Sequence, residues 1–217
     1  MKSIAIAAAL AATQAFASNV YRECQMPDVE QNFDLDAYLG LWYEAYRDVE
    51  CRYEDGVCNT AHYSMRDDGD IRVRNNEYLE DTQEWGGGTG KAFVVDPSQD
   101  EGYLKVKFVP FVPAGDYKVL GTDYDNYTVI YTCNGFLGMY NIEYVWILTR
   151  DTNPSDDVLD TAMNVVREKV PLYDITALTT TAQGDHALSD GSACPYDTAP
   201  QSVNTDEIGW IANYALE

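Results

Sequence analysis

The side chains with the most obvious capacity for chemistry are five cysteines, Cys24, Cys51, Cys58, Cys133 and Cys194. In an oxidising compartment, an odd number of cysteines predicts two disulfides and one remaining thiol. Spacing alone does not choose the pairs. Thiol nucleophiles act as thiolates, and the acidic residues around Cys51 disfavour that form.

Other catalytic and cofactor motifs are missing from the sequence. His62 and His186 are the only histidines and stand far apart, so no zinc site is expected. No Gly-x-Ser-x-Gly elbow is present. The glycine run at 86–90 lacks the Gly-Lys-Ser/Thr of a phosphate-binding loop, and no helix is expected to follow it. We therefore predict no enzyme activity, no metal and no cofactor, and interpret the glycines as a tight bend in a strand.

The charge balance disfavours polyanionic partners. The chain has 36 acidic and 14 basic residues, for a formal net charge of −22. Such a chain repels nucleic acids and anionic membrane surfaces. The acidic excess is interpreted as a solvated surface, with binding of cations or of a basic partner as the alternative.

Residues 1–17 have the features of a secretory signal peptide: an early lysine, an apolar stretch, and Ala-Phe-Ala before Ser18. No later stretch reaches the roughly 20 apolar residues of a membrane span. The sequence therefore predicts a secreted protein with one domain at 18–194 and a tail at 195–217 that resembles nothing we can place.

Alternating polar and apolar residues predict eight strands. They cover about 41–48, 57–65, 71–79, 82–95, 103–108, 117–122, 127–133 and 142–149. Eight antiparallel strands, most of them neighbours in sequence, favour an all-β, up-and-down barrel. Such a barrel can enclose one small ligand. One helix is expected after Asn153, with an apolar face that packs on the barrel wall, followed by a ninth strand near 174–180 beside the first.

Three segments carry a family resemblance. Gly40-Leu41-Trp42, Gly121–Thr128 and Tyr144–Arg150 match in residues, order and spacing the signature of the lipocalin family, with the apolipoprotein D and bacterial lipocalin branch the most similar. The resemblance runs from about Cys24 to about Cys194. It implies a structural plug in which Gly40 turns the chain and Arg150 lies across Trp42. It also implies the disulfides Cys24–Cys133 and Cys58–Cys194.

The resemblance also implies a ligand cavity. Trp146 matches a cavity tryptophan, Tyr144 and Leu148 share its face by alternation, and Tyr46 and Tyr131 are expected neighbours. Expected ligands are fatty acids, sterols, retinoids or tetrapyrroles, which suit a tyrosine-rich pocket. Two alternatives stay open: the aromatic side chains fill the barrel completely, or the barrel is a structural scaffold in an extracellular assembly.

The implied pairing leaves Cys51 without a disulfide partner. Cys51 lies in the first long loop, at about 48–55, and in lipocalins the corresponding loop folds over the barrel mouth as a lid. Cys51 is then a free or capped thiol, the link of a covalent dimer, or a competitor for Cys58. An inward-facing cysteine is also the nucleophile of those lipocalins that are enzymes. Asn126-Tyr-Thr is a glycosylation sequon, although its place in a hairpin restricts access.

Overall fold

A computed structural model describes residues 20–21, 23–51, 54–136, 140–200 and 209–210. The predicted signal peptide at 1–17 lies outside the described residues, as does most of the tail after residue 200.

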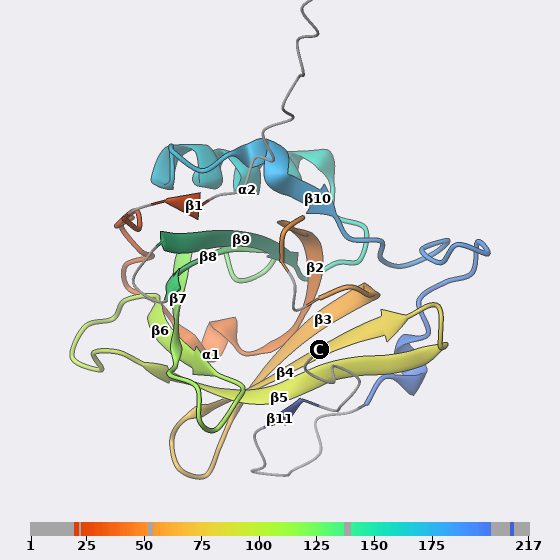
Figure 1. The fold of residues 1–217 in the computed structure, drawn as a ribbon, viewed down its shortest axis with the longest axis horizontal. Coiled ribbons are helices and arrows are strands. Elements are labelled where there is room, and N and C mark those ends of the chain that lie inside the picture. The colour runs from red at the N-terminus through yellow and green to blue at the C-terminus, as the bar shows by residue number, and fades with distance from the viewer. Residues whose placement is uncertain (1–19, 22, 52–53, 137–139, 201–208, 211–217) are drawn as a thin grey trace, which may run out of the picture.

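Eight antiparallel strands form a closed barrel (Figure 1). They are β2 (Gly40–Asp48), β3 (Val57–Met65), β4 (Ile71–Leu79), β5 (Glu84–Val94), β6 (Tyr103–Lys107), β7 (Gly115–Thr122), β8 (Tyr127–Phe136) and β9 (Tyr140–Thr149). Each pairs with the next in sequence, and β9 returns to pair with β2. The pairing of β9 with β2 closes the sheet on itself, so the eight strands leave no unpaired edge. This confirms the predicted up-and-down barrel.

Three short strands extend the barrel wall. β1 (Val20–Tyr21) pairs with β9, and β11 (Gly209–Trp210) pairs with β5. β10 (Leu178–Thr180) pairs with the second half of β2, beyond the residues of β2 that pair with β3. The ninth strand is thus present but shorter than expected, because η1 (Ile175–Ala177) is a 3-10 turn begun by the Asp174 side chain. A second 3-10 turn, η2, covers Tyr196–Thr198.

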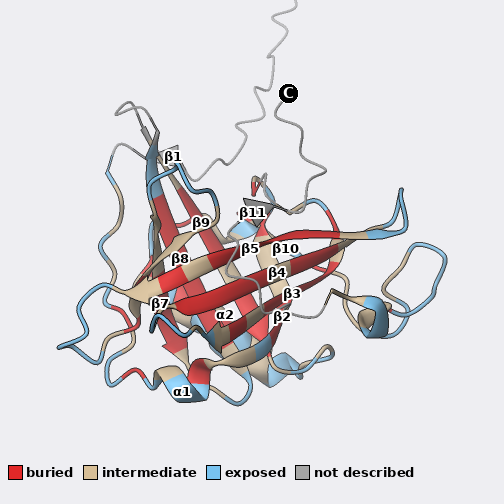
Figure 2. Ribbon diagram, turned by 90° about the horizontal axis from the view of Figure 1, so that it is seen from below, coloured by how far each residue is buried: buried red, intermediate tan, exposed pale blue. Residues whose placement is uncertain are grey.

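The predicted helix is α2 (Asp156–Lys169), which follows Ser155 at its N-cap position and lies against the outside of β7, β8 and β9 (Figure 1). Its buried residues Ala162 and Val166 belong to an outer core between helix and wall. A second core fills the barrel's closed end, so the strands are buried on both faces along much of their length (Figure 2). The apolar side chains on both the inner and the outer face of the strands are therefore removed from water, and both sets stabilise the fold.

The closed end is shut by α1 (Leu35–Tyr38) and the expected plug contact. Cζ of Arg150 lies 3.6 Å from the centroid of the Trp42 ring, and Trp42 is fully buried. Gly40 starts β2 with a φ of +98°, a conformation that side chains with a Cβ rarely adopt.

Both implied disulfides are confirmed. Cys24–Cys133 fastens the N-terminal arm to β8, and Cys58–Cys194 fastens the C-terminal segment to β3. Because each closes a long loop, each reduces the entropy of the unfolded chain. The alternative bridge from Cys51 to Cys58 is excluded, since Cys58 is paired with Cys194.

The glycine run lies within β5, as the strand interpretation predicted. Gly87 has a φ of +115°, and a Cβ added there would be 2.1 Å from the Asn75 carbonyl oxygen on β4. The backbones of β4 and β5 therefore approach each other at Gly87 more closely than a residue with a Cβ would allow.

Candidate functional site

The end of the barrel opposite α1 holds a cavity of about 570 Å³. Side chains from seven of the eight barrel strands and from the segment 108–114 line it. The aromatic lining residues are Tyr63, Phe108, Tyr117, Tyr144 and Trp146, and the aliphatic ones include Ala61, Val73, Val106, Ile130 and Leu148. The aromatic side chains thus line a space and do not fill it.

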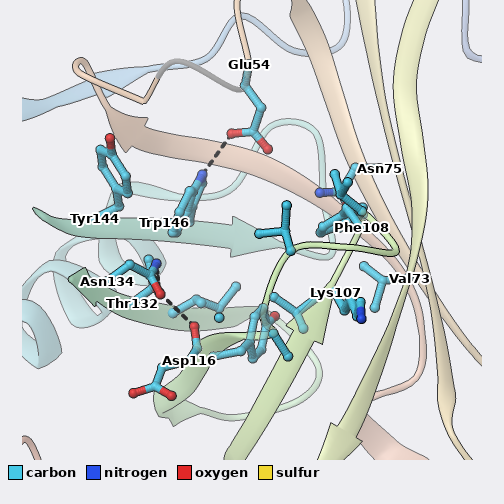
Figure 3. A pocket seen from close by; sticks show the side chains of 18 of the residues that line it. Glu54, Val73, Asn75, Lys107, Phe108, Asp116, Thr132, Asn134, Tyr144 and Trp146 are labelled. Atoms are coloured by element: carbon cyan, nitrogen blue, oxygen red, sulfur yellow. Dashed lines mark hydrogen bonds between the residues drawn. The ribbon is translucent and has the colours of Figure 1, made fainter. Parts of the chain in front are cut away.

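Three predicted ligand-binding residues lie together on β9. Tyr144, Trp146 and Leu148 alternate along the strand and line the cavity. The rings of Tyr144 and Trp146 lie 5.8 Å apart (Figure 3). Trp146 is half-buried, so one part of its indole is fixed in the wall and another faces open space. A hydrophobic ligand in the cavity would lie against this surface.

Two predicted neighbours lie elsewhere, and their assignment to the cavity was wrong. Tyr131 is fully buried in the outer core beneath α2, because Ile130 is the residue of β8 that pairs with Trp146 and shares its inward face. Tyr46 also packs in the outer core. A β-bulge between Glu44 and Tyr46 reverses the alternation of β2 at that point.

Sequence reasoning missed a chain of tyrosine hydroxyls between the cavity and the plug. Tyr117 shares hydrogen bonds of 2.7 Å with both Tyr63 and Tyr38, and Tyr38 also accepts one from Thr128. Burial raises the pKa of Tyr38 to about 12 and the pKa values of the other two well above the ordinary range. The inner end of the cavity is therefore apolar but carries neutral hydroxyl groups. Alternation along β3 and β7 was the signal available for Tyr63 and Tyr117.

A pair of carboxyls was also missed. Glu44, on β2, and Glu54, in the loop before β3, both line the cavity, and their carboxyls are hydrogen-bonded to each other. Trp146 donates its indole N–H to Glu54 over 2.8 Å (Figure 3). Glu44 is almost wholly buried and forms an ion pair of 2.9 Å with Arg47. Burial, followed by the charge of Glu44, raises the pKa of Glu54 well above its ordinary value.

The remaining polar lining is mixed. The side-chain oxygen of Asn75 is closed off from solvent and has no hydrogen-bond partner. Lys107 and Asp116 also line the cavity, and Asp116 pairs with Lys105 over 3.0 Å. An unsatisfied buried acceptor carries a free-energy penalty.

Cys51 is buried, and its thiol lies 3.7 Å from a carboxyl oxygen of Glu54. It is not among the residues that line the cavity. Residues 52 and 53 of the expected lid loop lie outside the described residues. Asn126 is exposed, and its side-chain nitrogen donates to Asp123 over 2.8 Å, so glycosylation there stays a prediction.

Within the described ranges, no three His, Cys, Asp or Glu side chains gather in a way that could hold a metal ion. Neither α1 nor α2 is long and apolar enough to cross a membrane, and the described chain has no other α-helix.

Comparison with known proteins gives consistent matches. The family model described as "Lipocalin-like domain" matches residues 33–183. Apolipoprotein D of Macaca fascicularis is 32% identical over 163 residues, which cover 74% of this chain and 82% of that protein. The outer membrane lipoprotein Blc of Vibrio cholerae is 39% identical over 140 residues, or 64% of this chain and 77% of its own.

Solved structures support the fold. Insecticyanin from the tobacco hornworm Manduca sexta matches with a TM-score of 0.67 at 20% identity, covering 82% of this chain and 94% of its own. Lobster apocrustacyanin A1 matches with a TM-score of 0.61 at 23% identity, covering 76% and 84%.

Proposed function

This chain belongs to the lipocalin family, and we propose that it carries or buffers a small hydrophobic molecule in its barrel. The observation that supports this most directly is the cavity of about 570 Å³ lined by Tyr144, Trp146 and Leu148. Its volume falls within the roughly 300–1,000 Å³ of small-molecule sites. The same observation favours carriage over a purely structural scaffold, for which an internal cavity has no use.

Burial of apolar surface is the driving force. A ligand gains about 25 cal/mol for each Å² of apolar surface removed from water. The hydroxyls of Tyr63 and Tyr117 lie at the inner end, where they orient a polar group on the ligand. Fatty acids, sterols, retinoids and tetrapyrroles all offer the required apolar surface.

We further propose that the protein is secreted and acts as a carrier, not an enzyme. The two disulfides suit an oxidising compartment. Both join residues of one chain, and Cys51 is buried, so a covalent dimer through Cys51 would require that side chain to leave its position. Glu54 beside Cys51 disfavours the thiolate that catalysis would need.

Fluorescence titration with retinol tests the carrier proposal, and extraction of the purified protein for mass spectrometry reports any resident ligand. Retinol should quench tryptophan emission saturably, and Trp146→Phe should lose most of that signal. Tyr131→Phe is a matched control, because its ring lies outside the cavity. A stoichiometric extracted lipid or pigment would support carriage. Absence of both saturable binding and an extracted ligand would overturn it.

A further inference from the structure

The two cavity carboxyls impose a charge preference on the ligand. Glu44 and Glu54 contact each other through a hydrogen bond, which two ionised carboxylates cannot form, so the pair holds one proton. With the Arg47 guanidinium, which pairs with Glu44 over 2.9 Å, this group of three residues has a net charge of zero. Both carboxyl groups belong to residues that line the cavity.

We propose that the barrel selects hydrophobic ligands that carry a protonated amine, and that the ammonium group replaces the proton shared by Glu44 and Glu54. This inference rests on the proposed carrier function and specifies its ligand class. The proton leaves to solvent as the ammonium enters. The two carboxylates, Arg47 and the ammonium then again sum to zero charge.

The donors of an ammonium group suit this lining. Asn75 lines the same cavity as Glu54 (Figure 3), and Glu44 and Glu54 present carboxyl oxygens there. An ammonium group carries three N–H donors, whereas a carboxylate ligand carries none. A ligand that brings donors can therefore bond to the carboxyl oxygens of Glu44 and Glu54, whereas a ligand with only acceptors cannot do so as a donor.

The rest of the lining agrees with a cationic ligand. Three acidic residues, Glu44, Glu54 and Asp116, line the cavity against one basic residue, Lys107. The ring of Trp146 is held in place by its bond to Glu54, and aromatic faces attract cations at close range. A fatty-acid carboxylate placed beside Glu54 would instead add a negative charge to a partly desolvated group whose charges already sum to zero.

The test compares three probes with one apolar chain: dodecylamine, dodecan-1-ol and dodecanoate. Binding to the disulfide-intact protein is measured by calorimetry at about 0.15 M salt, which screens surface charges beyond about 8 Å. We expect dodecylamine to bind at least about tenfold more tightly than dodecan-1-ol, and dodecanoate more weakly than either. Titration in two buffers of different ionisation enthalpy should show release of about one proton per bound amine.

Glu54→Gln keeps the acceptor for Trp146 and a donor for Glu44 but cannot release the proton. It should reduce the preference for amine to about threefold or less and abolish proton release. Asp160→Asn makes the same charge change on the exposed outside of α2 and should preserve both effects.

The outcomes separate the two proposals. If dodecan-1-ol binds and dodecylamine binds no better, the amine inference is wrong and the carrier proposal stands. An amine preference retained in Glu54→Gln would assign it to the acidic surface and also overturn the inference. Failure of all three probes would count against carriage itself.

Discussion

Replacing Arg150 with alanine should remove the plug at the closed end of the barrel. Its guanidinium stacks on Trp42 and also closes α1, because it donates hydrogen bonds to carbonyl oxygens that the short helix leaves exposed. The five acceptors are the carbonyls of Ala37 at 3.0 Å, Tyr38 at 3.3 Å, Leu39 at 2.9 Å, Leu41 at 2.7 Å and Tyr124 at 2.9 Å.

The expected cost follows from these contacts. The desolvated cation–π contact with Trp42 contributes about 1 kcal/mol. Carbonyls near the surface recover water when Arg150 is removed, so only about two of the five hydrogen bonds lose a full 1 kcal/mol each. The total is about 3 kcal/mol, which lowers a urea midpoint by about 1 M.

Equilibrium unfolding in urea with disulfides intact measures this cost, with Arg167→Ala as the matched control. Arg167 is exposed on α2, and its side chain donates a hydrogen bond to Asn164 over 2.8 Å. Its removal should change stability by less than about 0.5 kcal/mol. If both variants unfold at the same urea concentration, the plug role of Arg150 is refuted.

Three further perturbations test other parts of the structure. Gly87→Ala should destabilise by more than about 2 kcal/mol in the same assay, because the new Cβ meets the Asn75 carbonyl. Gly69→Ala, also at positive φ but in open space, is the control, and equal losses would contradict the close-approach argument. Cys51 should react with a thiol reagent only after unfolding, and rapid labelling of the native protein would show that it is not buried. Because Glu54 has a raised folded-state pKa, wild-type stability should fall as pH rises above about 4.5, the ordinary value. Glu54→Gln should remove that slope, and a stability difference that does not vary with pH would show that Glu54 is not the group responsible.

The architecture was predictable because its signals are local and repeated. Alternation located the eight barrel strands, and the segments around Trp42 and Arg150 indicated which strands meet at the closed end. The helix could be predicted from the Asn153-Pro154-Ser155 start signal and an apolar face, although Ser155 makes no side-chain cap hydrogen bond. These features depend on near neighbours in sequence, so single-chain reasoning recovers them.

The cavity was less predictable because it depends on register. One bulged residue between Glu44 and Tyr46 turns Tyr46 outward. On β8, the register pairs Ile130 and not Tyr131 with Trp146, so Ile130 faces the cavity. A change of one residue exchanges the two faces of a strand. Glu54 was missed for a different reason: it lies in a loop, where no period indicates which way a side chain points.

Two carboxyls, Glu143 on β9 and Glu54 in the loop before β3, separate folding from binding. Glu143, fully buried on the outer side of β9, accepts hydrogen bonds from Tyr131 and from both the backbone and the side chain of Gln25, and so ties the N-terminal arm to the barrel. All these donors come from the chain itself, so Glu143→Gln should reduce stability and leave ligand affinity unchanged. Glu54 accepts hydrogen bonds from the Trp146 indole N–H and the Cys51 thiol, contacts the Glu44 carboxyl, and lines the cavity. Its substitution should therefore change what the barrel binds more than how firmly the barrel folds.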